Sequence, residues 1–404
     1  MTTENKDNIG RLSRNFRLQT SSAFASHIGE SIASLLFLWI ILIYSNSSIL
    51  GGLYGGIGYG LGLLYLPISF YTSRIKNKKR LVIKYETFRA VSVLLVLGVL
   101  FTGIHSFVII SIFASSIILT TGALIVSPIH SMWLSEFVKK EQYHRAFSLR
   151  YIVHSASSIM GSAIAGMITY FSFYYGVMIF FVAMLISTIL TTMLKPKNDN
   201  IPAQENKGFR ESISKALADK TIKQYLLTTA LFENSIGAPM YLIVEALVLI
   251  SFSKSPLALT LLIVVTLVGG IVGPAISSIF QHGNIRKKNI VLSILIIPTL
   301  VIVPFLDSYL LVAISLFAYG VIASSAGPFV ESLHYQIAEG EQLLYLTSAH
   351  RTITGIGSAT TVIMVGIAIK FFGVSIGFYI SAAFAFITAV SYILSKELKK
   401  FNTT

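Results

Sequence analysis

The chain has 404 residues, of which 54% are hydrophobic and only 12% are charged, and its formal net charge is +14. Soluble proteins carry about 25% charged residues, so this composition excludes a water-soluble protein and predicts an integral membrane protein. No cysteine is present, which excludes disulfides, thiolate metal sites and a cysteine nucleophile.

Long apolar runs follow one another along the chain, and they are close to the ~20 residues that a helix needs to cross a bilayer. A spanning β-barrel would instead show alternating segments of roughly ten residues. We therefore predict an all-α membrane protein with twelve transmembrane helices. The predicted spans cover residues 20–44, 51–72, 85–104, 107–133, 148–171, 175–194, 224–252, 257–280, 290–306, 309–334, 351–371 and 375–395.

The widest polar break separates the sixth span from the seventh. It covers residues 195–223 and contains Pro196 and Pro202 before a polar, helix-permissive run. The break predicts three parts: an N-terminal six-helix bundle over residues 1–194, a cytoplasmic linker with a surface helix over residues 195–223, and a C-terminal six-helix bundle over residues 224–404.

The two halves repeat short patterns in the same order. Pro128, Glu141, Gln142 and Ser148 return at one spacing as Pro328, Glu341, Gln342 and Ser348. The segment 26–29 is echoed by 234–237, and Lys79-Arg80 is echoed by Arg286-Lys287. Internal repeats of this kind are typical of transporters, in which the substrate site is built where two related bundles meet.

Basic residues gather on the side of the membrane that holds both termini. That side collects clusters such as 11–17, 74–84, 139–150 and 286–288, whereas the opposite side has only Lys254 and Lys370. The positive-inside rule therefore predicts a multi-pass protein of the cell membrane with both termini cytoplasmic. The net positive charge reflects this topology, and we expect no nucleic-acid partner.

Glycines crowd the second span, where seven of the twelve residues from Gly51 to Gly62 are Gly. The run does not follow a strand, as a dinucleotide-binding fingerprint would, and no Gly-x-x-x-x-Gly-Lys-Ser/Thr loop occurs in the chain. We therefore interpret the run as a helix surface that lets a neighbouring helix approach closely. No cofactor and no bound metal are predicted.

Two motifs carry a family resemblance. The loop after the second span, 69–80, keeps Arg74 and the basic Lys79 and Arg80 of a pattern in which Ser73 replaces an Asp, and span five keeps Gly161 and Gly166. With its twelve spans and long central loop, the chain resembles the major facilitator superfamily, and the segment 128–166 resembles its macrolide-efflux-type branch of drug exporters.

The resemblance implies the major facilitator fold, which consists of two pseudo-symmetric bundles of six helices. It also implies that Gly161 and Gly166 form an antiporter-like helix-packing motif. The loop residues Arg74, Lys79 and Arg80 are expected to take part in a conformational latch. Because Ser73 cannot supply the usual negative charge, Glu136 is our candidate for the missing carboxylate of that latch.

Ionisable residues deep inside spans are costly unless they face a cavity or a partner. Glu30 lies about ten residues into span one, and Glu233 occupies a similar depth in span seven. His27 precedes Glu30 by one turn, and Asn234 and Tyr241 follow Glu233. These five residues are the candidate substrate and coupling site. Hydrogen bonding to a neighbouring helix, with a role in packing only, is the alternative for each of them.

Other ionisable residues in the spans have simpler interpretations. Glu245 is expected at the outer rim of span seven, about 18 Å beyond Glu233. Arg89 is expected to pair with Glu86, one turn before it on the same helix. Glu331 and His334 form an i, i+3 pair near the inner end of span ten, where pairing at the cytoplasmic face is favoured.

Three classes of function fit these patterns. The favoured one is a secondary active transporter that couples proton entry to efflux of hydrophobic or amphipathic small molecules by alternating access, as an antiporter of the multidrug type. An importer or exporter of a specific metabolite, lipid or metal on the same fold is the alternative. A polytopic membrane enzyme is remote, because an enzyme does not require a two-fold repeat. The expected partners are a small-molecule substrate, a proton or another coupling ion, and the lipid bilayer.

Overall fold

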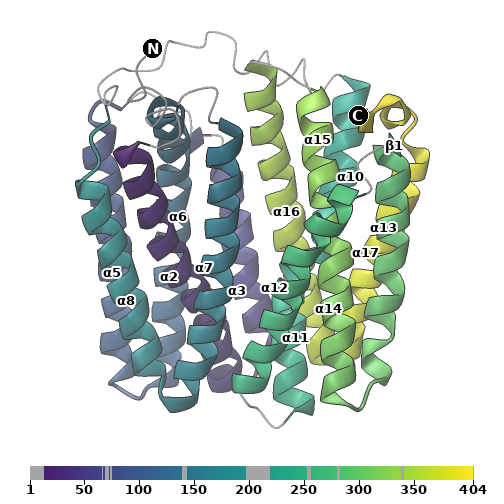
Figure 1. The fold of residues 1–404 in the computed structure, drawn as a ribbon. Helices are drawn as coiled ribbons and strands as arrows, with labels where there is room; N and C mark the ends of the chain where they lie inside the picture. Colours follow the sequence, from purple (N-terminus) through teal and green to yellow (C-terminus); the bar gives the residue numbers. More distant parts are fainter. Residues whose placement is uncertain are drawn as a thin grey trace, which may run out of the picture. The chain divides into compact units, whose positions relative to one another are not determined.

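The computed structural model describes residues 13–65, 67–68, 72, 75–138, 143–196, 219–252, 256–279, 283–337 and 341–403. Most of these residues are helical (Figure 1). The α-helices are α2 (Arg14–Ser45), α3 (Ser48–Gly60), α5 (Lys78–Leu100), α6 (His105–Phe137), α7 (Tyr143–Phe171), α8 (Phe173–Thr192), α10 (Lys220–Ile236), α11 (Ala238–Ser251), α12 (Pro256–Ile279), α13 (Ile285–Val301), α14 (Tyr309–Ser325), α15 (Gly327–Ile337), α16 (Glu341–Phe372) and α17 (Ser375–Leu394). The short elements are the 3-10 helices η1 (Leu61–Leu64), η3 (Val303–Phe305) and η4 (Glu397–Lys400), and the strands β1 (Gly283–Asn284) and β2 (Asn402–Thr403).

The helices agree with the predicted spans. Within the described residues, eight helices are long and apolar enough to cross a membrane. Three shorter apolar segments, Ser48–Leu64, Val153–Ile168 and Pro239–Ser251, fall on predicted spans two, five and seven. Helix α5 falls on predicted span three, and it is more polar because Lys84, Glu86 and Arg89 lie in it. The predicted all-α membrane fold is therefore confirmed.

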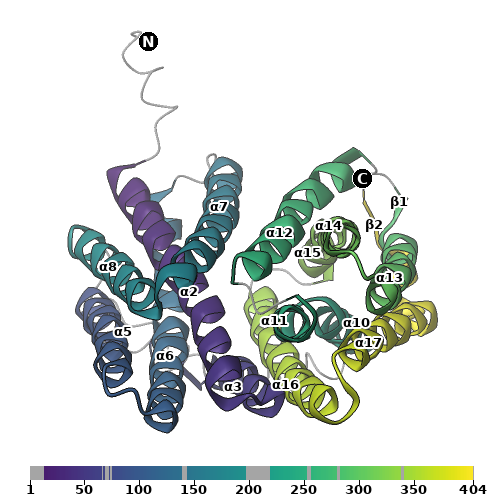
Figure 2. The same cartoon turned by 90° about the horizontal axis from the view of Figure 1, so that it is seen from below.

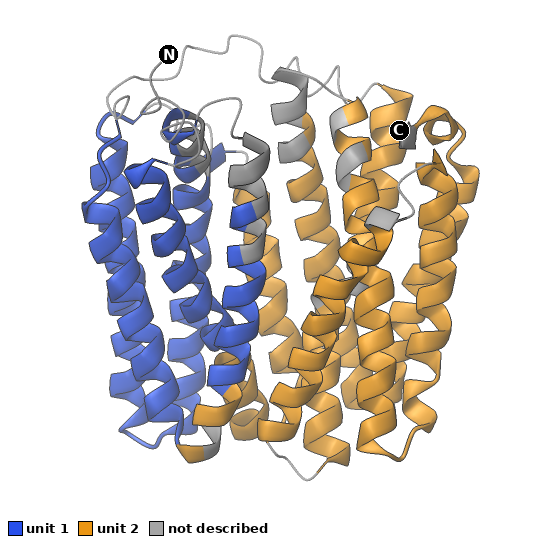
Figure 3. Ribbon diagram, in the orientation of Figure 1, with its two compact units in different colours: residues 1–34, 67–165, 172–204 blue, residues 35–66, 166–171, 205–404 orange. Residues whose placement is uncertain are grey.

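The chain forms two compact units (Figure 3). Unit 1 contains residues 1–34, 67–165 and 172–204, and unit 2 contains residues 35–66, 166–171 and 205–404. Residues 35–66 and 166–171 group with the second unit, although they precede the predicted linker in sequence. Most of that linker, residues 197–218, lies outside the described residues. The division into halves at 195–223 therefore stays a prediction.

In unit 1, α5 packs against both α6 and α8. The first part of α2 joins them through a buried hydroxyl cluster, in which Ser22 Oγ lies 2.9 Å from Ser187 Oγ and 3.0 Å from Thr191 Oγ1. An apolar cluster that includes Phe16, Trp133 and Phe137 packs near the start of α2 and the end of α6. Small polar groups thus replace bulky side chains where α2 and α8 meet.

In unit 2, α12 lies beside α14 and α13 lies beside α17 (Figure 2). Helix α10 packs against both α16 and α17. The end of the chain is tied to the start of α13, because β1 and β2 pair antiparallel with Asn284 opposite Asn402. Arg286 Nε donates a 2.6 Å hydrogen bond to the carbonyl oxygen of Tyr392, so this member of the repeated basic pair caps the last turn of α17.

The glycine-rich face of α3 meets α16 within unit 2, as the sequence predicts. A Cβ placed on Gly52 would lie only 2.9 Å from the carbonyl oxygen of Val362 and 3.1 Å from the Cα of Gly366. Ser48 Oγ also donates a 2.8 Å hydrogen bond to the Gly366 carbonyl. The two backbones therefore approach so closely that a side chain at Gly52 cannot be accommodated without movement.

This seam gives a prediction with a control on the same helix. We expect Gly52→Ala to destabilise the protein by about 1–3 kcal/mol, because the added methyl group forces α3 away from α16. A Cβ on Gly58 meets no described atom within 4 Å, so Gly58→Ala should be neutral or stabilise by up to about 1 kcal/mol. Thermal unfolding of both variants in nanodiscs tests the difference, and equal effects would contradict it.

Candidate functional site

Glu30 of α2 belongs to a cluster of ionisable side chains in unit 1. His27 Nδ1 lies 3.2 Å from Glu30 Oε2, and Ser26 Oγ donates a 3.2 Å hydrogen bond to Glu30 Oε1. Arg89 of α5 forms an ion pair with Glu30 Oε1. The Arg89 side chain is only 3% exposed, whereas that of Glu30 is 35% exposed. A buried guanidinium therefore compensates the charge of a partly accessible carboxylate.

The helices position this cluster through simple spacings. Ser26, His27 and Glu30 share one face of α2 because residues three and four apart are neighbours on a helix. Gly122 of α6 leaves room for Arg89, since a Cβ at Gly122 would lie 2.7 Å from Arg89 Cγ. His154 of α7 adds a second imidazole, and its ring centroid lies 4.5 Å from that of His27 in an edge-to-face arrangement.

The predicted ion pair between Arg89 and Glu86 does not form, although Arg89 attracts Glu86 electrostatically. Arg89 turns to Glu30 on another helix, and Glu86 Oε2 is buried with no hydrogen-bond partner among the described residues. Spacing along one helix identifies possible neighbours, whereas the packing of α5 against α2 decides which carboxylate the guanidinium reaches. Ser26, Arg89 and His154 are the members of this cluster that the sequence did not place in the site.

Glu233 of α10 lies in a different setting in unit 2. His350 Nε2 of α16 is 3.6 Å from Glu233 Oε1, within ion-pair range but beyond a hydrogen bond, and the Glu233 side chain is 43% exposed. The rings of His334 and His350 lie 6.2 Å apart, and Tyr225 contacts both rings. The Tyr225 hydroxyl is 2.9 Å from His334 Nδ1.

His350 is a site residue that the sequence analysis missed. It is a lone histidine at the start of a predicted apolar span, and this feature could have identified it. The expected partner of His334, Glu331, has a side chain outside the described residues. Arg351, the neighbour of His350, stacks over the ring of Tyr65 at 4.8 Å and attracts Glu233 electrostatically without contacting it within ion-pair distance.

The helix that carries Glu233 is interrupted one turn later. Helix α10 ends at Ile236, Gly237 donates its backbone N–H to the Glu233 carbonyl at 2.9 Å, and α11 starts at Ala238 with Pro239 in its first turn. Proline is tolerated in a first turn because its missing N–H would lack a helical partner there. The helix is therefore divided into α10 and α11 directly after the residues around Glu233. The side chain of Asn234 lies outside the described residues.

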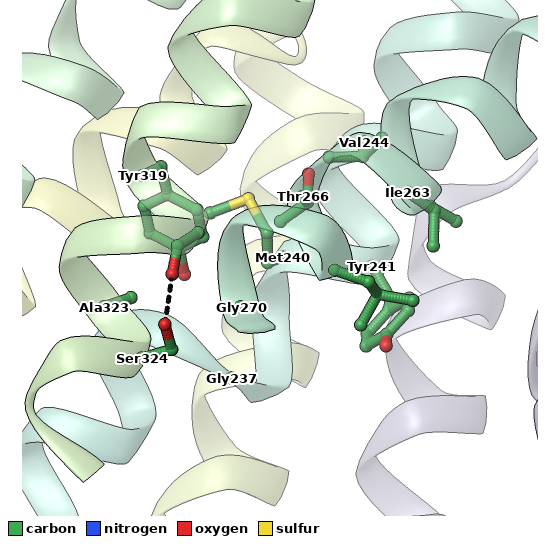
Figure 4. Close-up of a pocket in the computed structure, with 12 residues that line it drawn as sticks. Gly237, Met240, Tyr241, Val244, Ile263, Thr266, Gly270, Tyr319, Ala323 and Ser324 are labelled. Atoms are coloured by element: carbon green, nitrogen blue, oxygen red, sulfur yellow. Dashed lines mark hydrogen bonds between the residues drawn. The ribbon is translucent and has the colours of Figure 1, made fainter. Parts of the chain in front are cut away.

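A pocket of about 280 Å³ opens beside this break, between α11, α12 and α14 (Figure 4). Its lining is mostly apolar and aromatic, and it includes Tyr241, which the sequence placed in the cavity. The lining residues are Gly237, Met240, Tyr241, Val244, Ile263, Thr266, Leu267, Gly270, Tyr319, Gly320, Ala323 and Ser324.

Glu245 lies one turn beyond Tyr241 on α11, and the prediction of a solvated rim position for it is wrong. Its exposure is 0%, and neither carboxylate oxygen has a hydrogen-bond partner among the described residues. Position along a helix gives the depth of a residue in the membrane. It does not show whether neighbouring helices bury the face on which the residue lies. Burial of a carboxyl group without a hydrogen-bond partner is costly.

The buried carboxyl gives a stability prediction. We expect Glu245→Leu to raise the free energy of unfolding by about 1–3 kcal/mol, since it removes a polar group that lacks partners. Glu245→Gln is the matched control, because it keeps an unsatisfied polar group and should give no gain. Unfolding in nanodiscs measures both variants. A loss of stability in the leucine variant would mean that Glu245 has a partner.

The predicted latch residues and Gly161 belong to unit 1, whereas Gly166 belongs to unit 2. Arg74 lies outside the described residues, and Lys79 and Glu136 are half-buried while Arg80 is exposed. The latch formed by these four residues stays a prediction. At Gly161, a Cβ would lie 2.7 Å from the Ile28 carbonyl oxygen, so α7 and α2 approach closely there. Gly166 is also buried, and the Thr260 side chain occupies the place of its missing Cβ.

Among the side chains that the structure describes, no three His, Asp or Glu residues come together as metal ligands would. The polar clusters of the two units instead combine carboxylates with imidazoles and, in unit 1, with a guanidinium. These groups can bind and release protons or pair with a charged molecule.

The sequence matches the model of the Major Facilitator Superfamily over residues 20–342. No curated protein sequence matches the chain. Among solved structures, a bacterial homologue of the iron transporter ferroportin in an inward-facing state has a TM-score of 0.76 at 12% identity, covering 96% of this chain and 99% of the other. The nucleoside transporter NupG has a TM-score of 0.68 at 13% identity, covering 96% and 100%.

A transporter of the POT family in complex with 5-aminolevulinic acid gives a TM-score of 0.76 at 11% identity, covering 96% of this chain and 97% of that one. At these identities the likeness concerns the fold, and the cargoes of these proteins differ from one another. Together with the helical architecture and the ionisable clusters inside the spans, the family match classifies the protein as a membrane transporter. The chain belongs to the Major Facilitator Superfamily.

Proposed function

We propose that the protein exports hydrophobic or amphipathic small molecules in exchange for protons, by alternating access in the cell membrane with both termini cytoplasmic. The observation that supports this most is the unequal setting of two carboxylates inside the spans. Glu30 is ion-paired with a buried arginine, whereas Glu233 has a histidine as its ion-pair partner.

The arginine makes Glu30 unsuitable as the proton carrier. Protonation of Glu30 would leave the guanidinium of Arg89, which is 3% exposed, without its counter-ion. A buried cation without a partner is strongly unfavourable. The Glu30–Arg89 pair is therefore a fixed charge pair that anchors α5 to α2.

Glu233 can gain or lose a proton at a lower free-energy cost than Glu30. Its partner His350 is charged only when protonated, so the pair can exist as two neutral groups or as an ion pair. The carboxylate is 43% exposed, which gives a proton access to it. We therefore assign the coupling proton to Glu233, with His350 as its partner. Release of this proton on one side of the membrane and rebinding on the other would couple the gradient to transport.

The test is substrate-dependent proton flux in proteoliposomes that contain a pH-sensitive dye. Three probes distinguish the classes of cargo: ethidium and erythromycin as amphipathic compounds, and uridine because one structural relative is a nucleoside transporter. The proposal expects ethidium or erythromycin to trigger proton movement in the direction opposite to their own. Proton flux with uridine alone would contradict export of amphipathic compounds and indicate transport of a specific metabolite. Transport of any probe without proton movement would contradict the assignment of Glu233 as the coupling residue.

A further inference from the structure

We infer that the pocket between α11, α12 and α14 binds a flat, uncharged aromatic portion of the transported molecule. The inference rests on the proposed function for the identification of this ligand as a transport substrate. The pocket itself is argued only from its walls, all of which belong to unit 2.

The shape of the pocket is set by three glycines and two tyrosines. Gly237, Gly270 and Gly320 contribute backbone in place of side chains. Tyr241 and Tyr319 supply ring surface (Figure 4). Tyr241 is 40% exposed, so its ring is available to a ligand. Offset or edge-to-face contact with such rings favours an aromatic ligand.

The chemistry of the walls disfavours a polar occupant. The Thr266 hydroxyl donates to the Leu262 carbonyl at 2.7 Å, and the Ser324 hydroxyl donates to the Gly320 carbonyl at 2.7 Å. Both hydroxyl protons are thus used within their own helices. Met240, Val244 and Ile263 offer only apolar surface, and the two tyrosines add their rings with one hydroxyl each. A molecule entering this pocket gains mainly by burying apolar area.

The pocket also adjoins the proposed coupling residue. Gly237 lines the pocket and is hydrogen-bonded through its N–H to the Glu233 carbonyl. An occupant packed against Gly237 therefore lies within one helical turn of Glu233.

A substitution at Gly270 tests the inference, because there is open space at the position of its missing side chain. A Cβ there meets no described atom within 4 Å, so Gly270→Leu should fill the pocket without displacing a helix. The probe is 2-naphthol, with decahydro-2-naphthol as a saturated analogue that is neither flat nor aromatic. Equilibrium dialysis of protein-containing nanodiscs against empty nanodiscs measures binding and subtracts partition into lipid.

We expect wild-type protein to bind 2-naphthol at least about tenfold more tightly than its saturated analogue, and Gly270→Leu to weaken 2-naphthol binding by about tenfold or more. Gly98→Leu is the control, because Gly98 of α5 also has open space around it but lies in unit 1. Equal affinity of both probes, or unchanged binding in Gly270→Leu, would overturn the inference.

A second variant and a comparison with the flux assay complete the test. If Gly270→Leu does not fold, Tyr241→Leu removes an aromatic wall while keeping an apolar side chain, and it should abolish the preference for 2-naphthol over the saturated analogue. Unchanged preference in that variant would also overturn the inference. Binding requires no gradient, so a pocket that binds 2-naphthol in a protein without proton-coupled flux would refute the proposed function and leave the binding site standing.

Discussion

Replacing Glu233 by glutamine is expected to abolish accumulation of ethidium against its gradient while leaving its exchange without a gradient intact. Glutamine keeps the size and hydrogen-bonding capacity of the side chain but cannot carry a proton. The variant should therefore allow ethidium to equilibrate across the membrane, because cargo binding and the conformational change no longer require proton transfer. Ethidium fluorescence in proteoliposomes with an imposed pH gradient measures this directly.

The control for this experiment is Asp307→Asn, which removes a carboxylate from an exposed loop position. It should accumulate ethidium like the wild type. His350→Gln should lose part of the ethidium accumulation that Glu233→Gln loses, because it removes the partner that accommodates the charge of the Glu233 carboxylate. Wild-type accumulation by Glu233→Gln would show that another group carries the proton, and His27 would then be the next candidate.

The second large effect concerns stability. Glu30→Gln should destabilise the protein by about 2–3 kcal/mol, because it leaves the buried Arg89 without a counter-ion. Breaking a fully buried pair costs about 3–5 kcal/mol, and the smaller value reflects the 35% exposure of the Glu30 side chain. Unfolding of nanodisc-embedded protein, followed by intrinsic fluorescence, provides the measurement.

A double variant separates charge compensation from other roles of Glu30. Glu30→Gln combined with Arg89→Gln removes both charges and should recover most of the lost stability, whereas two independent side chains would give additive losses. His27→Gln is the control within the same cluster, since it leaves the ion pair in place. Full stability of the single Glu30→Gln variant would mean that Arg89 finds another anion.

Local patterns in the sequence predicted much of the fold and part of the site. Apolar runs located the helices because the bilayer imposes a minimum length on each span. The i, i+3 spacing placed His27 one turn before Glu30, and the two side chains lie 3.2 Å apart in the structure. The glycine run of span two predicted close helix packing, which α3 and α16 display. Each of these inferences concerns one helix and its immediate surroundings.

What the sequence did not reveal depends on contacts between helices. Arg89 and His350 join their carboxylates from helices that are distant in sequence, so no spacing rule connects them. The prediction for Glu245 was wrong for a related reason. Its position in the sequence gives its depth along the span, but its burial depends on the helices that pack against α11. The pocket likewise needs three helices, and none of its glycines is distinctive alone.

The Glu30–Arg89 pair also has a consequence for how the protein is made. The two residues are 59 positions apart in the chain, and ribosomes add about 5–20 residues per second. The first span therefore spends about 3–12 s with an unpaired carboxylate before α5 is synthesised. A charged residue at the centre of a span costs about 2.5–3.5 kcal/mol on insertion scales. We expect the first span, tested alone in a translocation assay, to insert more efficiently as Glu30→Gln than as the wild type, although the same substitution weakens the finished protein.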